Sequence, residues 1–204
     1  MAGKTVRLGT RGSELALAQA EELRSRLIET WHDQSVTAEI VVITTTGDRI
    51  LDRPLAEIGG KGLFTLEIEK QLARGDIDAA VHSTKDMPTR LPEGLELSCF
   101  LPRQSVADAF VSSKAKSIAD LGEGARVGTS SLRRRALIKR MRPDLDIVDF
   151  RGNVQTRLAK LENGTADATI LAEAGLIRLG LQGKATSILD IRRFPPAPGR
   201  RHWR

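Results

Sequence analysis

Two short sequence signatures occur in the same order in both halves of this chain, and they constrain its fold more than any other feature. The first is an apolar run that ends in Gly-Thr and is followed by a serine; it covers residues 7–13 and again 126–131. The second, Gly-x-x-Asp-Ala-x-apolar, covers residues 75–81 and again 164–170. Their shared order favours two similar α/β domains over one. We place domain 1 at 1–102, domain 2 at 103–193, and a hinge remnant with a basic tail at 194–204.

Apolar patterning within the first half predicts alternating strands and helices. Ser13 is a suitable N-cap for a helix whose inner face carries Ala16, Ala20, Leu23 and Leu27. A second helix over 63–74 should end at Gly75, a residue that readily adopts a left-handed C-terminal cap. Residues 46–62 contain four glycines and many charges, which predicts a mobile loop. Strands are predicted over 6–9, 40–45, 77–81 and 95–101, with Pro102 as the crossing point between domains.

This architecture predicts where a ligand should bind. In open α/β sheets, ligands bind beyond the carboxyl ends of the strands. If the two domains face each other, the loops at those ends line one cleft. The expected loops are 9–13, 44–48 and 82–86 in the first half, and 128–131, 151–153 and 172–175 in the second.

Composition narrows the possible functions. The net charge is +6, but residues 191–204 alone carry five arginines and no acid, so the rest of the chain is nearly neutral. Aromatic residues make up only 3%, with no tyrosine for base stacking, which disfavours a nucleic-acid binder. One cysteine and three histidines disfavour a disulfide or a metal centre. No apolar run is long enough for a membrane span, and the N-terminus lacks a signal-peptide core, so we expect a protein of a reduced compartment without a membrane partner.

Three consecutive arginines, Arg133–Arg135, fall in the first turn of a helix predicted to open at Ser131. The helix dipole makes cations unfavourable there by about 0.3–1 kcal/mol each, so an anion at the helix N-terminus would explain them. Arg11, Arg151 and Arg157 come from neighbouring loops. The alternative is a solvated basic helix face, because Lys139, Arg140 and Arg142 follow on the same segment.

Residues 82–86, His-Ser-Thr-Lys-Asp, are the candidate for chemistry. Asp86 stands beside Lys85 at the end of a predicted strand and shortly before Pro88, which predicts an extended, exposed carboxylate. Such a carboxylate can stabilise a developing positive charge or transfer a proton. A plain surface Lys–Asp pair remains the alternative. For His82 we expect a hydrogen-bonded structural role, and for Cys99, within an apolar run, a place in the core.

Five longer motifs stand out along the chain: RLGTRGS (7–13), GGKGLF (59–64), AVHSTKDMP (80–88), VGTSSLRR (127–134) and RGNVQTR (151–157). They resemble the hydroxymethylbilane synthase family, also called porphobilinogen deaminases, and the similarity runs from about residue 5 to Gly199. The resemblance implies an enzyme of tetrapyrrole (porphyrin and heme) biosynthesis in the cytoplasm. It would condense four porphobilinogen molecules head to tail into hydroxymethylbilane and release ammonia. Implied too are a type 2 periplasmic-binding-protein-like fold, a monomeric state and a dipyrromethane cofactor that primes the growing pyrrole chain.

The resemblance also implies residue roles. Asp86 would be the catalytic carboxylate, with Lys85 beside it, assisting loss of ammonia and stabilising the resulting cation. Residues 46–62 would act as a lid over the cleft. The positions that match binding sites for pyrrole carboxylates and cofactor are Arg11, Ser13, Gln19, Lys61, Thr129, Ser130, Ser131, Arg133, Arg134, Arg151, Arg157 and Arg178.

The sequence departs from the family pattern after Gly199, where Arg200 takes the place of a glutamine. The family continues with a segment that returns to domain 1 and with a third, α+β domain that bears the cofactor-attachment cysteine. No residue of this chain matches that cysteine, so we expect a truncation or frame change, with self-association of the incomplete domain 1. The alternative function is a catalytically inactive fragment that only binds polycarboxylate pyrroles.

Overall fold

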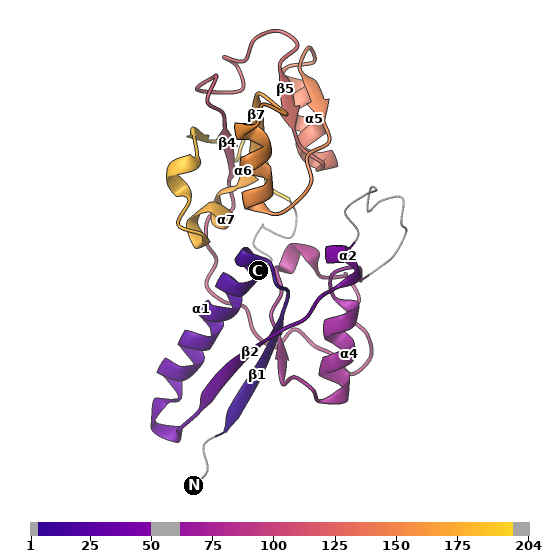
Figure 1. The fold of residues 1–204 in the computed structure, drawn as a ribbon, viewed down its shortest axis with the longest axis vertical. Coiled ribbons are helices and arrows are strands. Elements are labelled where there is room, and N and C mark those ends of the chain that lie inside the picture. The colour runs from indigo at the N-terminus through magenta and orange to yellow at the C-terminus, as the bar shows by residue number, and fades with distance from the viewer. Residues whose placement is uncertain (1–3, 50–61, 198–204) are drawn as a thin grey trace. The chain divides into compact units, whose positions relative to one another are not determined.

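Parallel strands form the centre of each half of the chain (Figure 1). The structure is a computed structural model and describes residues 4–49 and 62–197. It divides into two compact units, Met1–Pro102 and Arg103–Arg204, which we call unit 1 and unit 2. None of its described helices is both long and apolar enough to cross a bilayer.

Unit 1 is built on a three-stranded parallel sheet in the order β2-β1-β3. Helix α1 runs beside β1 and β2, and α4 beside β1 and β3 (Figure 1). The core is small: its buried large side chains include Leu8, Ile43, Ile68 and Ile77. The elements are β1 (Thr5–Thr10), α1 (Glu14–Thr30), a 3-10 turn at His32–Gln34, β2 (Thr37–Val42), α2 (Thr46–Arg49), α4 (Leu66–Arg74), β3 (Ala79–Ala80) and a 3-10 turn, η2, at Thr84–Asp86.

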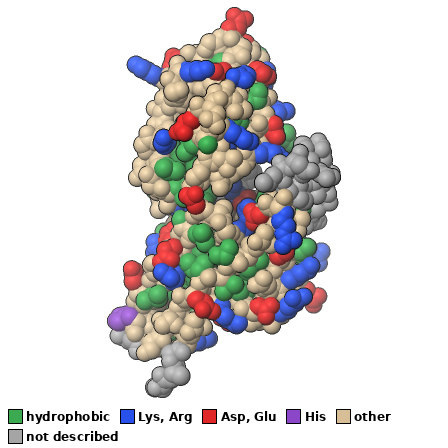
Figure 2. All heavy atoms as spheres, viewed as in Figure 1, with side chains coloured by type: hydrophobic (Ala, Val, Ile, Leu, Met, Phe, Trp, Pro, Cys, Tyr) green, Lys and Arg blue, Asp and Glu red, His purple; other side chains and the backbone are tan. Residues whose placement is uncertain are grey.

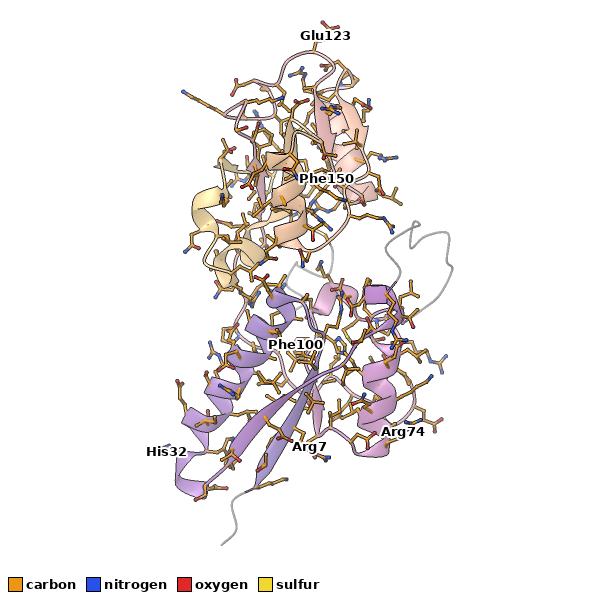
Figure 3. All side chains as sticks on the ribbon, viewed as in Figure 1. Arg7, His32, Arg74, Phe100, Glu123 and Phe150 are labelled. Atoms are coloured by element: carbon orange, nitrogen blue, oxygen red, sulfur yellow. The ribbon has the colours of Figure 1, made fainter. Side chains whose placement is uncertain are left out.

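Unit 2 has a five-stranded sheet in the order β6-β5-β7-β4-β8. Strands β6, β5 and β7 are parallel, whereas β4 runs antiparallel to both β7 and β8. Its core is larger than that of unit 1 and includes Phe110, Phe150 and Phe194; Figure 3 labels Phe150 in the middle of the unit. The elements are β4 (Asp108–Val111), β5 (Arg126–Gly128), α5 (Leu132–Met141), β6 (Asp146–Val148), α6 (Val154–Glu162), β7 (Ala168–Ala172), α7 (Glu173–Arg178), a 3-10 turn at Gln182–Lys184 and β8 (Ser187–Ile188).

The two units have the same local structure at the two repeated sequence signatures. Ser13 caps α1 by accepting a hydrogen bond from the Ala16 amide, and Ser131 caps α5 in the same way. Gly75 and Gly164, which follow α4 and α6, both have positive φ, at 75° and 71°. The order β2-β1-β3 in unit 1 therefore corresponds to β6-β5-β7 in unit 2.

Several predicted boundaries in unit 1 are wrong. The strand predicted over 40–45 is displaced to Thr37–Val42, and the one over 77–81 shrinks to two residues. The helix predicted from residue 63 begins at Leu66. Residues 46–49 of the predicted loop form α2, because Asp48 accepts hydrogen bonds from the amide and hydroxyl of Thr45 and fixes this turn. The remainder of that loop, residues 50–61, lies outside the described residues.

The strand predicted over 95–101 does not form. No strand within the described residues pairs with this segment, and apolar side chains without a hydrogen-bonding neighbour do not make a strand. Leu97 and Phe100 are 46% and 65% exposed, and Cys99 is exposed rather than part of the core. Hydrophobic side chains reach the surface over unit 1 in the view of Figure 2.

Candidate functional site

Arg11 follows the carboxyl end of β1, and its guanidinium is held by contacts with Asp48 and Phe64 of the same unit. Its Nε donates to both carboxylate oxygens of Asp48, at 3.1 and 3.2 Å, and its Nη2 makes a second, shorter bond to Oδ1. The guanidinium lies over the ring of Phe64, 4.1 Å from the centroid. Arg11 is thus held between α2 and the segment before α4.

The carboxylate of Asp48 is stabilised in its charged form. Partial burial acts to raise its pKa, but hydrogen bonds from Arg11 and Thr45 outweigh burial and lower that pKa. Asp48 and Phe64 were not among the predicted site residues. Asp48 ends one of the loops expected to line the cleft, but the sequence could not predict that it pairs with Arg11, 37 residues away.

The carboxyl end of β3 leads into the 3-10 turn η2, which carries Lys85 and Asp86. The amide of Asp86 donates to the carbonyl of Ser83 at 2.9 Å, so Asp86 sits in a closed turn rather than in the extended conformation we predicted. The extended residue is Met87, directly before Pro88, as the steric effect of proline on its predecessor requires. The Lys85 Nζ and Asp86 Oδ1 atoms are 3.7 Å apart, and both side chains are partly exposed.

Gln19 is joined to this turn by a direct contact. Ser83 Oγ donates to Gln19 Oε1 at 3.0 Å, so helix α1 and the segment after β3 meet at this point. Lys61, another predicted binding residue, lies outside the described residues.

His82 differs from the hydrogen-bonded structural histidine we expected. Its Nε2 atom is buried without a hydrogen-bond partner. Burial lowers the pKa of His82, and the positive charge of Arg11 acts in the same direction, against the opposing effects of Glu69 and Asp86. The imidazole is therefore held in its neutral form more strongly than a free histidine.

In unit 2 the segment from β5 to α5 uses its hydroxyls as acceptors. Thr129 Oγ1 accepts from the Ser131 amide at 3.2 Å, and Ser130 Oγ accepts from the Phe150 amide at 3.0 Å. Ser131 Oγ accepts from the Arg134 amide as the helix cap. An accepting hydroxyl keeps its own proton for donation, so these three side chains can still donate to a ligand.

The first turn of α5 holds three arginines in three different environments. Arg134 is 5% exposed, Arg133 is half-buried and Arg135 is exposed. Arg133 and Arg134 both donate to the fully buried carboxylate of Asp108, with Arg134 Nη2 2.7 Å from Oδ1. The alternative of a solvated basic face is therefore wrong for Arg134, whose side chain is buried. An anion does lie at these arginines, but it is a residue of the chain.

The surroundings of Arg157 indicate that the arginines of unit 2 would be stabilised by an additional anion. Arg157 Nε donates to the Gly152 carbonyl at 3.0 Å. Burial and the neighbouring positive charge of Arg134 together lower its pKa to about 10, against the opposing effect of Asp149. Asp149 also pairs with Arg151 at 3.3 Å. A half-buried guanidinium beside a second one favours binding of an additional anion.

The remaining candidates are placed by their elements. Ser13 caps α1 at the carboxyl end of β1, and Arg178 lies half-buried in the last turn of α7, the helix that follows β7. A shallow depression of about 380 Å³ lies at the opposite edge of the unit 2 sheet, lined by Lys114, Asp167 and residues 121–125, and it includes none of the candidates. Over residues 4–49 and 62–197 no three His, Cys, Asp or Glu side chains are grouped to hold a metal.

Comparison with known proteins identifies the family. The family described as porphobilinogen deaminase, dipyromethane cofactor binding domain, matches residues 6–201. The chain belongs to this family. The porphobilinogen deaminase of Paracoccus denitrificans (strain Pd 1222) is 59% identical over 192 residues, which are 94% of this chain and 61% of that protein. The chain thus spans less than two thirds of this porphobilinogen deaminase relative.

Solved structures agree on the fold. The methionine-binding protein MetQ superposes with a TM-score of 0.52 at 16% identity, over 91% of this chain and 78% of that one. A periplasmic substrate-binding protein of an ABC transporter from Coxiella burnetii gives 0.51 at 15%, over 91% and 79%. These neighbours confirm the predicted periplasmic-binding-protein-like α/β architecture of this porphobilinogen deaminase family member.

The described residues fit the dipyrromethane group after which the family domain is named. A group built from two carboxylated pyrroles needs cations, and Arg157 beside Arg134 in unit 2 is a pair of cations with a demand for negative charge. Within unit 1, the exposed Lys85 at the end of β3 can bind a carboxylate, whereas the charge of Arg11 is offset by Asp48. The single cysteine, Cys99, lies in an exposed irregular segment and is not one of the predicted binding residues.

Proposed function

We propose that this chain carries the substrate- and cofactor-binding residues of a hydroxymethylbilane synthase, which joins four porphobilinogen molecules head to tail and releases ammonia. The observation that carries the proposal is the group of arginines in unit 2: the half-buried Arg157 is bonded to the Gly152 carbonyl at 3.0 Å, next to Arg151 in the same segment, and lies near enough to the charge of Arg134 that its pKa is lowered. Porphobilinogen bears an acetate and a propionate side chain, so a growing chain of pyrroles supplies the negative charge that this region favours. The proposal includes a cytoplasmic location, which the family resemblance implies.

The proposed chemical step belongs to Asp86. As the C–N bond of the aminomethyl group breaks, ammonia leaves and positive charge develops on the remaining methylene carbon. A carboxylate at this point stabilises that charge without becoming covalently attached. The methylene carbon then bonds to the free α-carbon of the terminal pyrrole of the growing chain, and the proton released from that α-carbon can be accepted by Asp86. When dipyrromethane is bound, it supplies the pyrrole to which the first substrate unit is joined.

Positioning is the role proposed for the other residues. Lys85, 3.7 Å from Asp86, can bind a substrate carboxylate beside the reacting carbon. Ser83 and Gln19, joined at 3.0 Å, fix the start of the turn η2 relative to α1. Arg133, Arg151, Arg157 and Arg178, together with the hydroxyls of residues 129–131, would orient pyrrole carboxylates in unit 2, and the buried Arg134 would add positive charge behind them.

The test is to measure porphobilinogen binding by calorimetry and ammonia release by the full 204-residue chain. Arg157→Leu should weaken binding by about tenfold or more, the value of one charge-assisted hydrogen bond. Arg135→Leu, on an exposed arginine of α5, is the matched control and should bind as the parent does. Failure of the parent to bind porphobilinogen would overturn the proposal. Binding without ammonia release would instead support the alternative, an inactive polycarboxylate-binding fragment.

A further inference from the structure

The direction of β4 places an acidic residue at an otherwise cationic edge. Strands β5 and β7 end at the edge where α5 and α7 begin, but β4 runs antiparallel to β7 and therefore starts there. Asp108 is the first residue of β4 and pairs in register with Ala172, the last residue of β7. Its side chain thus arrives at the carboxyl ends of the parallel strands, where α/β proteins bind ligands.

The carboxylate of Asp108 bridges two arginines that are adjacent in sequence. Successive residues on a helix point about 100° apart, so Arg133 and Arg134 would diverge without a common partner. Oδ2 of Asp108 accepts from Arg133 Nη2, and Oδ1 accepts from Arg134 Nη2 at 2.7 Å. The Asp108 side chain is completely buried, so water does not compete for these bonds.

Each guanidinium is also fixed at a second point. Arg133 Nη1 donates to the carbonyl of Pro195 at 2.5 Å, and Arg134 Nη1 donates to the carbonyl of Ile170 at 2.8 Å. Two fixed bonds define the plane of a guanidinium, which has five N–H donors in a rigid array. For Arg133, whose side chain keeps 22% of its surface exposed, the orientation of the remaining donors is then set in advance.

We propose that Asp108 is a positioning residue: an internal carboxylate, anchored by the buried Arg134, that aims the partly exposed Arg133 for the carboxylates of a ligand. The inference rests on the proposed function, since the ligand is the pyrrole carboxylate named there. Electrostatics alone predicts the opposite effect of removing Asp108: the site would gain one positive charge and bind an anion more tightly. Positioning predicts weaker binding, because the two arginines would lose their common direction and repel each other.

The variant that separates the two is Asp108→Asn in the full chain, which keeps the size of the side chain and removes its charge. We expect porphobilinogen affinity to fall by about tenfold or more. The matched control is Asp167→Asn. Asp167 also pairs with cations, accepting from Lys114 Nζ at 2.6 Å and the Arg126 amide at 2.7 Å, but it lies at the opposite edge of the same sheet. That variant should bind porphobilinogen as the parent does.

A second variant keeps the test decisive if Asp108→Asn folds poorly. Asp108→Ala leaves room for a small carboxylate between the two arginines, so millimolar formate should raise its melting temperature and restore ordered guanidinium signals of Arg133 and Arg134 in 15N-arginine spectra. Chloride at equal ionic strength should do neither. The same spectra of the parent should show both guanidinium groups protected from hydrogen exchange, and those of Asp108→Asn should show that protection lost.

The outcomes distinguish this inference from the proposed function. Tighter or unchanged porphobilinogen binding by Asp108→Asn, or guanidinium groups as ordered in that variant as in the parent, would overturn the role of Asp108. If the parent binds no porphobilinogen, the proposed function fails, and the exchange and formate measurements still decide whether Asp108 positions the two arginines.

Discussion

Arg7 donates to Asp78 from its backbone amide at 2.8 Å and from its guanidinium at 3.0 Å, joining the start of β1 to the residue before β3. Its Nη2 also reaches the carbonyl of Gly75 at 2.7 Å. Unit 2 repeats the arrangement: the Arg126 amide donates to Asp167 at 2.7 Å, and Arg126 Nη2 donates to the carbonyl of Gly164 at 2.8 Å. The repeated signatures therefore mark the same structural latch in both units.

The first prediction concerns acid stability. The hydrogen bond from the Arg7 side chain, with the one from its amide, lowers the pKa of Asp78 to about 2. Because the folded-state pKa lies below the unfolded value, the stabilisation is complete above about pH 4 and is lost as the pH falls toward 2. Asp78→Asn should destabilise unit 1 at neutral pH by under about 1 kcal/mol, since the pair is partly exposed, and the difference from the parent should shrink in acid. Urea unfolding at several pH values measures this, with Asp76→Asn as the neighbouring control.

The sequence predicted features that depend on neighbouring residues, but not those that depend on residues far apart in the chain. The caps at Ser13 and Ser131 and the turn at Gly75 are set by neighbouring residues, and they were predicted correctly. The strand predicted over 95–101 was wrong because a strand needs a hydrogen-bonding partner from a distant part of the chain, which composition cannot reveal. Likewise, the arginines of α5 were identified as an anion site, but Asp108 lies about 25 residues away from them in sequence, and nothing around it indicates its partners.

Asp86→Asn tests the proposed chemistry. The substitution keeps the shape of the turn η2 and removes the charge that stabilises the cationic methylene carbon, so turnover should fall by orders of magnitude, if the chain or a longer form of it is active. The unfolding midpoint should stay close to the parent value, because the Asp86 side chain is partly exposed. Steady-state ammonia release together with thermal unfolding measures both effects. Near-normal turnover would contradict the role assigned to Asp86.

The two arginines that share Asp108 should differ in their effect on stability. Arg134→Leu removes a buried partner of a completely buried carboxylate, which costs about 3–5 kcal/mol. Arg133→Leu should cost less, because its side chain is partly exposed and Asp108 keeps its bond to Arg134. Chemical denaturation of the two variants, with Arg135→Leu as a near-neutral reference, checks the order. Equal losses for the two variants would show that Asp108 is not held mainly by Arg134.

His82 should make stability depend on pH because burial disfavours its charged form, whereas the effect of Asp78 comes from a favoured charged form. Burial lowers the pKa of its imidazole in the folded chain below the ordinary histidine value of about 6.5. As the pH falls below that value, the unfolded chain takes up a proton before the folded chain does, so stability decreases until the pH reaches the folded-state pKa. The groups that act on His82 are Glu69 on α4, Asp86 in η2 and Arg11 after β1. His82→Asn should flatten stability between pH 7 and 5, and the His82 signal in an NMR titration should move at lower pH than that of a free imidazole.

Cys99 should react as a surface thiol. It is exposed in the irregular segment that also exposes Leu97 and Phe100, so a disulfide reagent should modify it completely in the native chain. Cys99→Ser should abolish the reaction, because the chain has no other cysteine. A requirement for denaturant before modification would contradict the exposed position.

The two latches also have a consequence for the order of folding. Arg7 and Asp78 are 71 residues apart, whereas Arg126 and Asp167 are 41 apart. Closing the longer loop costs more chain entropy, and contacts between residues that are closer in sequence form faster. Unit 2 also has the larger hydrophobic core, so burial of apolar side chains offsets more of the chain entropy lost when its loop closes. The half of the chain that leaves the ribosome last is therefore the half we expect to reach its native structure first.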